Sequence, residues 1–192
     1  TSAIKNLSRI LSIKSFDNNV VATSELTTRV TEGTTTIYVT VEVSSSILLL
    51  PEVPMTGRLD NPRVGYFTNP LTNFSDGQQR VNKKQFITRW RLEPKPEDRE
   101  AYLRGELVEP QKPIVFYIEN STPYRWRKYI KQGIEDWQVA FEHAGFKNAI
   151  IAKDITDDME VDMDDVNYSV LTYAASTKAN AMGPSILDPR SG

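Results

Sequence analysis

The chain offers a single histidine, His143, for metal binding, proton transfer or activation of a nucleophile. A zinc site built on His143 would need carboxylates for every other ligand, and the sequence contains no H-E-x-x-H pattern. A Ser-His-Asp triad would depend on the same residue, and no G-x-S-x-G elbow accompanies it. The absence of cysteine also removes thiolate nucleophiles, disulfides and cysteine-bound zinc. We therefore predict no catalytic residue and no metal ligand here, and we interpret His143 as a solvated residue near the end of a helix.

Acidic side chains crowd the stretch 154–165. They include Asp157, Asp158, Glu160, Asp162, Asp164 and Asp165. About six to eight converging oxygen ligands would bind calcium, but the glycine and the terminal glutamate of an EF-hand loop are missing. Repulsion among like charges favours a solvated surface loop, with a calcium site as the alternative.

Two further constellations could bind a ligand. An aspartate between two guanidinium groups can fix a loop, so Arg58, Asp60 and Arg63 predict a structural clasp, with an anionic-ligand anchor as the alternative. Small residues and a proline enter the segment Gly183–Asp188, which we predict to be a strand at the edge of a sheet. An unpaired edge can capture another extended chain, although most edge strands are only edges.

The elements that would position these residues divide near residue 110. Before it, residues 1–50 predict an antiparallel β layer, in which Thr36–Val43 is a half-buried strand with Ile37, Val39, Val41 and Val43 on one face. A long irregular stretch rich in turn formers and aromatics follows, and Lys83–Leu92 resumes extended character. Prolines and a short charged helix, Pro96–Gly105, precede the boundary.

After residue 110 the pattern becomes strand, helix, strand. Ile114–Ile118 predicts a buried strand, residues 122–144 predict one long helix that Gly145 stops, and Asn148–Ala152 predicts a second strand parallel to the first. Tyr168–Ala174 predicts a third strand. The apolar stripe of the helix, which we expect to face the core, consists of Trp126, Ile130, Ile134, Trp137, Phe141 and Ala144.

Composition bounds the functions that the chain can have. Its 192 residues are 39% apolar and 25% charged, with a net charge of −2, which is typical of a folded soluble protein and argues against nucleic-acid binding. The longest apolar run, Ile47–Leu50, is far shorter than the roughly 20 residues of a membrane-spanning helix. The first residues contain no apolar stretch typical of a signal peptide, so we expect such a signal to be absent or removed.

Several long stretches resemble large zinc-dependent metalloproteases of bacterial envelopes. The region before the protease domain of that family is similar to Leu50–Met55, Arg58–Phe67 and Thr88–Pro94. The start of its metzincin-like domain is similar to Lys112–Ile118, Gly133–Phe146 and Asn180–Ser185.

The resemblance implies an α+β fold with two domains. Residues 1–110 would form a β-rich N-terminal domain, and residues 111–192 an incomplete metzincin-like N-terminal subdomain, a twisted mixed sheet backed by the helix 122–144. The substrate-binding edge strand would include Met182, Gly183, Pro184, Ser185 and Ile186. The zinc-binding H-E-x-x-H helix would follow residue 192, so the chain alone would be inactive. Without its neighbouring strand, we expect about the last twelve residues to be displaced or exchanged between chains.

The resemblance also implies partners and a location. The partners would be the remainder of the protease domain and, in the full-length protein, a peptide substrate and zinc. The location would be secreted, periplasmic or outer-membrane associated. Two alternatives stay open: a non-catalytic envelope module that binds a protein or glycan through its β-rich half, and a pro-segment role for residues 1–110.

Overall fold

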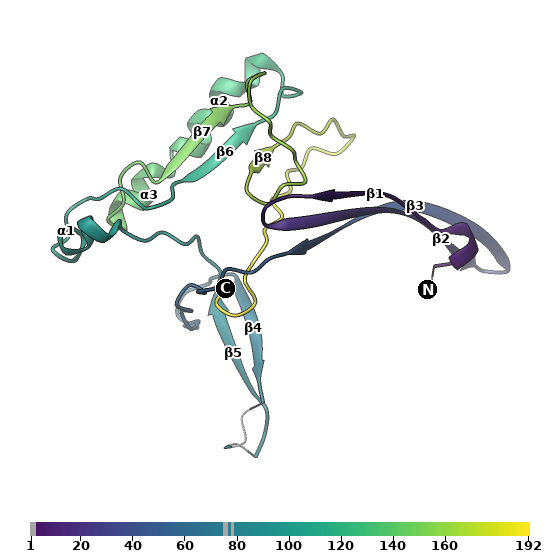
Figure 1. Cartoon of the computed structure of the whole chain (residues 1–192), viewed down its shortest axis with the longest axis horizontal. Coiled ribbons are helices and arrows are strands. Elements are labelled where there is room, and N and C mark those ends of the chain that lie inside the picture. Colours follow the sequence, from purple (N-terminus) through teal and green to yellow (C-terminus); the bar gives the residue numbers. More distant parts are fainter. Residues whose placement is uncertain (1–2, 75–76, 78) are drawn as a thin grey trace. The chain divides into compact units, whose positions relative to one another are not determined.

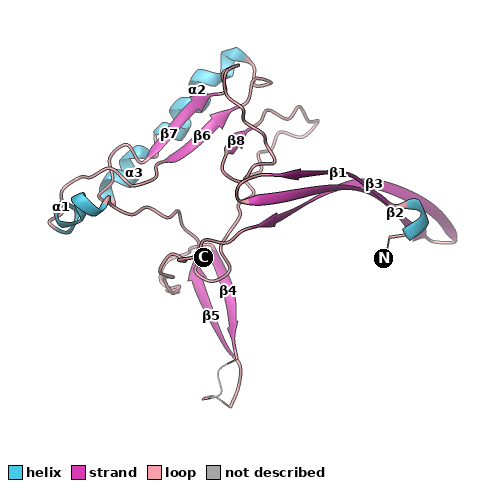
Figure 2. Cartoon of the chain, in the orientation of Figure 1, coloured by secondary structure: helices cyan, strands magenta, loops and turns pink. Residues whose placement is uncertain are grey.

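A computed structural model describes residues 3–74, 77 and 79–192 (Figures 1 and 2). The fold is of the α+β class and is richer in strands than in helices, which confirms the predicted class at that level. The chain forms two units, Thr1–Leu49 with Asp158–Ser169, and Leu50–Asp157 with Val170–Gly192. The boundary predicted at residue 110 lies inside the second unit, so these units and the predicted domains divide the chain differently.

The first unit contains a three-stranded antiparallel sheet in the order β1–β2–β3. After a 3-10 turn, η1 (Lys5–Leu7), come β1 (Arg9–Ser15), β2 (Asn19–Glu32) and β3 (Thr35–Leu48). Fourteen residues of β2 pair in register with β3, from Asn19 opposite Leu48 to Glu32 opposite Thr35. Gly33 supplies the positive φ of 61° that this tight connection needs. The antiparallel β layer predicted from the β-branched residues is confirmed.

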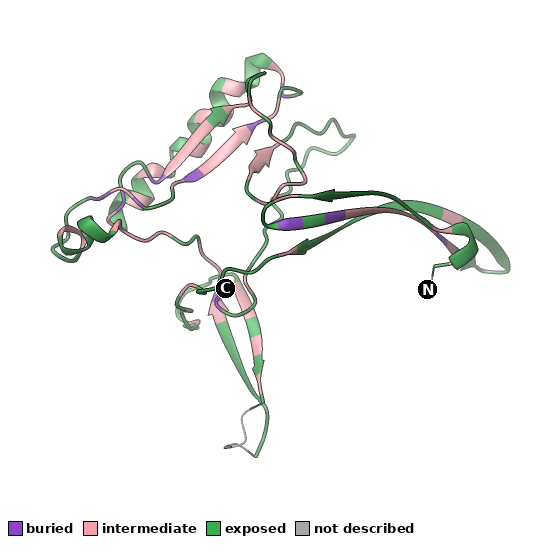
Figure 3. Cartoon of the chain, viewed as in Figure 1, coloured by how far each residue is buried: buried purple, intermediate pink, exposed green. Residues whose placement is uncertain are grey.

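The predicted alternation along β3 is also present, but of its four apolar residues only Val39 is half-buried as expected. Ile37, Val41 and Val43 do share one face of the strand, and they are 48%, 45% and 36% exposed (Figure 3). The buried residues of the sheet, Asn19 and Thr27 among them, lie on the opposite face. Alternation identifies a face that prefers to be buried, and it cannot say whether anything covers that face.

In the second unit, a hairpin of β4 (Thr68–Asn73) and β5 (Asn82–Ile87) forms a two-stranded sheet. The predicted extended segment Lys83–Leu92 therefore ends as a strand at Ile87. Leu59 forms an isolated antiparallel bridge to Phe86, a residue of β5 that also pairs with Asn69 of β4. Next come η2 (Pro96–Asp98) and α1 (Arg99–Leu103), where a short helix is predicted.

The strand–helix–strand unit follows the sequence prediction closely. β6 (Ile114–Ile118) and β7 (Ile150–Asp154) pair in parallel, with Ile114 opposite Ile150, and β8 (Ser169–Leu171) completes the order β7–β6–β8. Between β6 and β7 the chain forms α2 (Tyr124–Glu135) and α3 (Gln138–His143) instead of the single helix predicted over 122–144. The turn tightens at the junction, where Trp137 N donates to Ile134 O and Ala140 N donates to Trp137 O, each three residues back.

The face of the helices that packs inward differs from the predicted stripe. Trp126 and Trp137 are 43% and 64% exposed, so their prediction as core residues is wrong. Ile130, Ile134 and Phe141 are half-buried, as the stripe predicts. Gly145 has φ 93° and ends the helix as expected. The core beside it consists of Val108, Phe146 and Ala149, with Leu92, Ala101, Tyr102 and Phe141 packed against it.

Candidate functional site

The connection into β7 is held by one glutamine side chain. Gln138, the first residue of α3, accepts hydrogen bonds at Oε1 from the backbone N–H groups of Ala149 (3.0 Å) and Ile150 (3.3 Å). Its Nε2 donates to the carbonyl oxygen of Phe146 at 3.3 Å. One amide group thus satisfies three backbone groups of the loop between α3 and β7, which fixes where β7 begins.

A lysine and an aspartate connect α2 to the carboxyl end of β7. Lys131 Nζ on α2 pairs with Oδ2 of Asp154, and both side chains are about one-third exposed. Arg127, one turn earlier on α2, donates to the carbonyl oxygens of Thr122 and Asn120 in the loop after β6. Basic side chains of α2 therefore bind polar groups at and just after the carboxyl ends of β6 and β7.

The segment predicted as a substrate-binding edge strand, Met182–Ile186, lies in the second unit but forms no strand. All five residues are exposed, and Met182 and Ile186 are 87% and 64% accessible. Within the described part of the chain, none of their backbone groups pairs with another backbone group. The edge strand is thus a wrong prediction of secondary structure, because a strand exists only where a neighbour supplies the hydrogen bonds.

The residues immediately after this segment are anchored firmly. Asp188 and Arg190 form a two-oxygen pair, with Arg190 Nε 3.0 Å from Oδ1 and Nη2 2.7 Å from Oδ2. Arg190 Nη2 also donates to the carbonyl oxygen of Pro51 at 2.7 Å, and Asn69 Nδ2 donates to the carbonyl oxygen of Pro189. The hydrogen bonds from Arg190 hold the pKa of Asp188 below its ordinary value.

The predicted clasp of Arg58, Asp60 and Arg63 is not the arrangement that holds this loop. Among the described residues no ion pair joins these three side chains. The backbone fixes the segment instead, because Asp60 N donates to Gln85 O and Ile87 N donates to Arg58 O, at 2.8 and 2.9 Å.

Three other arginines form the clasp, and sequence reasoning missed them. Arg89, Arg91 and Arg190 donate to the carbonyl oxygens of Thr56, Val53 and Pro51. Burial lowers the pKa of Arg89, and the positive charge of Arg58 lowers it further. The one signal in the sequence is the pair Pro51 and Pro54. Proline has no N–H group and interrupts strand pairing, so carbonyl oxygens near it need hydrogen-bond donors other than those of a neighbouring strand. Arginine, with five donors, suits such oxygens.

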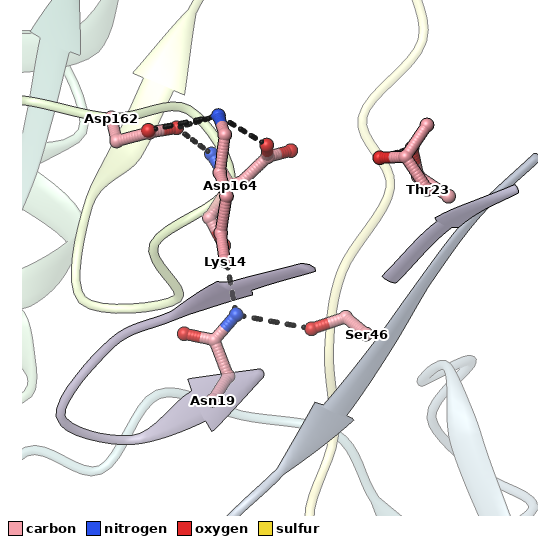
Figure 4. A network of polar contacts seen from close by, with 7 residues as sticks. Lys14, Asn19, Thr23, Ser46, Asp162 and Asp164 are labelled. Carbon is pink, nitrogen blue, oxygen red and sulfur yellow. Dashed lines mark hydrogen bonds and ion pairs between the residues drawn. The ribbon is translucent and has the colours of Figure 1, made fainter. Parts of the chain in front are cut away.

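In the first unit, two carboxylates of the acidic stretch bind a lysine (Figure 4). Lys14 Nζ lies 3.0 Å from Oδ2 of Asp162 and 2.9 Å from Oδ2 of Asp164. Asn19 Nδ2 donates to the carbonyl oxygen of Asp164 (2.8 Å) and to Ser46 Oγ (3.1 Å). These contacts anchor the loop on the sheet of the first unit. No group of three His, Asp or Glu side chains that could hold a metal ion occurs among the described residues.

Aromatic side chains gather on the outer face of α2. Trp126 lies 6.4 Å from Tyr129 between ring centroids, and the guanidinium of Arg125 lies 5.0 Å from the centroid of Trp126. With Ile130 and Tyr173, these residues line a shallow open hollow of about 450 Å³. His143 borders a second open hollow beside Trp137 and is exposed, as its interpretation as a solvated residue implies.

Comparison with known proteins finds a match for the first part of the chain. Residues 1–95 match DUF5117, a domain of unknown function. The DUF5117 match covers β1 to β5 and the three arginine-bound carbonyls near residue 50, and it ends before η2. No curated protein and no solved structure matches the chain. Within the described residues, none of the helices has the length and apolar character to cross a membrane.

Proposed function

We propose that this chain forms a non-catalytic part of a zinc metalloendopeptidase of the metzincin type. The resemblance of residues 50–55, 58–67, 88–94, 112–118, 133–146 and 180–185 to bacterial envelope metalloproteases is the reason for naming that class. The parallel strand–helix–strand unit formed by β6, α2, α3 and β7 suits the N-terminal subdomain of such a protease. On the resemblance alone, the proposal includes a secreted, periplasmic or outer-membrane-associated location.

The observation that carries the proposal is the unpaired backbone of Met182–Ile186. The segment is exposed, and within the described residues none of its backbone groups pairs with another backbone group. Such a segment can bind an extended peptide by main-chain hydrogen bonds that do not depend on the peptide sequence. The anchored residues Asp188 and Arg190 fix one end of it, which lowers the entropy lost when a peptide binds.

The donor set of this chain does not fit a zinc ion. Its one histidine, His143, is exposed at the end of α3, and no group of three metal-ligating side chains occurs in the described ranges. A structural or catalytic zinc needs at least three protein ligands. The proposal therefore assigns the metal and the water that it activates to the remainder of the protease domain, and it assigns peptide positioning to Met182–Ile186.

The test uses the full-length gene product and an unstructured peptide substrate. Ser185→Pro removes one backbone N–H and should raise KM several-fold with kcat nearly unchanged, because one main-chain hydrogen bond is worth about 0.5–1.5 kcal/mol. Ala179→Pro, in the exposed loop before the segment, is the matched control and should leave KM unchanged. An unchanged KM in Ser185→Pro, or an equal effect of both variants, would exclude peptide binding by this segment.

A second candidate is a non-catalytic envelope module that binds a glycan or a protein, here through α2 and not through the β-rich half for which the sequence predicts it. The exposed aromatic hollow formed by Trp126, Tyr129 and Tyr173 favours it, since aromatic faces bind apolar faces of ligands and Arg125 adds a donor. Calorimetric titration with a panel of oligosaccharides would test it. Binding that Trp126→Ala abolishes and Trp137→Ala preserves would favour the module, and the absence of binding would count against it. The pro-segment role of residues 1–110 stays a separate prediction.

A further inference from the structure

The sheet of the first unit sorts its side chains into one apolar face and one polar face. Residues paired across β2 and β3 point to the same side, so the register assigns each residue to a face. We call the apolar face the set formed by Ile10, Ile13, Val20, Ala22, Leu26, Val30, Ile37, Val39, Val41, Val43 and Ile47, together with Ser15, Ser24, Thr28 and Ser45 between them. On the apolar face, the stretch of β2 from Val20 to Val30 and the paired stretch of β3 from Ile37 to Ile47 present no ionisable side chain.

The elements that cover this sheet cover the opposite side. Asn19, Val21 and Thr27 are 3–5% exposed and lie on the polar face. There the Asn19 side chain donates to the carbonyl oxygen of Asp164 in the acidic loop, and the Thr27 hydroxyl donates to the carbonyl oxygen of Leu7. Among the described residues of the first unit, no such contacts cover the apolar face: Ile13 and Ile47 are 65% and 71% exposed, while Ala22, Leu26 and Val39 nearer its middle are half-buried (Figure 3).

The exposed apolar face is about as large as the largest apolar patches of monomeric proteins. β2 and β3 each contain 14 residues, and β1 adds a shorter third strand. Strand spacings of ~3.3 Å per residue and ~4.8 Å between strands give a flat area of roughly 550 Å². Two such faces in contact would bury about 1,100 Å², which is above crystal-contact size and near the range of specific interfaces. Isolated patches on monomers reach about 300–600 Å² and are often functional.

We propose that the apolar face binds a second copy of this chain, face to face, so that two sheets form a β-sandwich. The partner surface must be as apolar and as free of charge as the face itself, because a buried unpaired charge is costly. The same chain supplies such a surface, and a twofold axis through the face brings it against itself. Sheets stacked about 10 Å apart would then shield the exposed isoleucines and valines. This inference concerns the first unit and does not depend on the proposed peptidase function.

Sedimentation velocity of the 192-residue chain between about 1 and 100 µM tests the proposal, in the range where an interface of standard size associates. Dimers are expected, with Ile37→Lys raising the dimer dissociation constant at least about tenfold, since it buries a charge. Thr36→Lys, the neighbouring residue on the polar face, is the control and should leave the constant unchanged. Circular dichroism verifies the fold of both variants.

Cross-linking provides a second readout, which reports the face through which two copies meet. The chain has no cysteine, so a single introduced cysteine is unique. Val41→Cys on the apolar face should cross-link two copies through a bis-maleimide of about 10 Å reach, the spacing of packed sheets, and Glu42→Cys on the polar face should not. A monomeric wild type at 100 µM, or equal effects on the two faces, would overturn the proposal and assign the apolar face to a different partner.

Discussion

Arg190 Nη2 donates to the carbonyl oxygen of Pro51 at 2.7 Å across 139 positions of sequence. The same guanidinium holds both oxygens of Asp188, and Ser191 and Gly192 donate their N–H groups back to the Asp188 carbonyl oxygen. A carbonyl that lies after the last residue of a strand is thus satisfied by a side chain from the far end of the chain. The segment Met182–Ile186 is held at this point, although its own backbone is unpaired.

Arg190→Ala should loosen this anchor. The loss of these solvent-exposed hydrogen bonds predicts a small decrease in the free energy of unfolding. Hydrogen exchange of the Ser191 and Gly192 amides should become several-fold faster, because their acceptor, the Asp188 carbonyl, is no longer fixed. Arg104→Ala is the control, since the Arg104 side chain pairs with Glu106 two residues away and ties no distant segment among the described residues. Equal protection of these amides in wild type and Arg190→Ala would show that the anchor is unimportant.

The contact of Lys14 with Asp162 and Asp164 predicts a pH window. The hydrogen bond from Asp164 N–H, followed by that from Lys14, lowers the pKa of Asp162 below 3.8, and the two aspartates raise the pKa of Lys14 above 10.5. Stability from Asp162 is therefore present above pH 3.8 and is lost as the pH falls through its folded pKa. Stability from Lys14 is present below pH 10.5 and is lost as the pH rises through its folded pKa.

Lys14→Gln tests this window by removing the charge. The pKa of Asp162, followed by carboxyl-carbon NMR, should move up toward 3.8 in the variant, and Lys128→Gln should leave it unchanged. An Asp162 pKa that is the same in wild type and Lys14→Gln would contradict the contact.

The hydrogen bonds of the half-buried Gln138 side chain to the backbone predict that its removal destabilises the fold. Gln138→Ala should lower the free energy of unfolding by about 1–3 kcal/mol, because the N–H groups of Ala149 and Ile150 lose their acceptor in a part-buried site. Gln138→Glu keeps the acceptor and loses the donor to Phe146, so it should cost less. Gln132→Ala, at an exposed position of α2, is the control, and urea unfolding is the measurement. Equal effects of Gln138→Ala and Gln132→Ala would refute the role of Gln138.

Substitution of two glycines that end helices distinguishes the cost of backbone strain from the cost of a steric clash. Gly105 (φ 85°) and Gly145 (φ 93°) both require positive φ, but only at Gly145 would an added Cβ meet a neighbour, the Tyr102 ring at 2.6 Å. Gly105→Ala should cost about 1 kcal/mol from strain alone. Gly145→Ala should cost at least about 1 kcal/mol more, because the Tyr102–Phe146 stack must move. Thermal unfolding of both variants measures the difference, and equal losses would contradict the packing term.

The parts of this fold that were predictable from sequence are those set by local patterns. The run of β-branched and aromatic residues at 114–118 predicted β6 at its observed bounds, and Gly145 correctly marked the end of a helix. The failures came from long-range partners. No local pattern shows that Arg89 reaches Thr56, that the first unit leaves one face of its sheet exposed, or that Gly183–Asp188 pairs with no strand among the described residues. Trp126 was misplaced because the periodicity of a helix does not give the width of the surface that it covers.

The proposed role of this chain in a zinc peptidase is tested by peptide cleavage with the purified full-length gene product, after zinc removal and after zinc is restored. Cleavage should stop on chelation and return with zinc, while the 192-residue chain alone should stay inactive with or without the metal. A full-length product that carries no H-E-x-x-H sequence and cleaves no peptide in the presence of zinc would contradict that role.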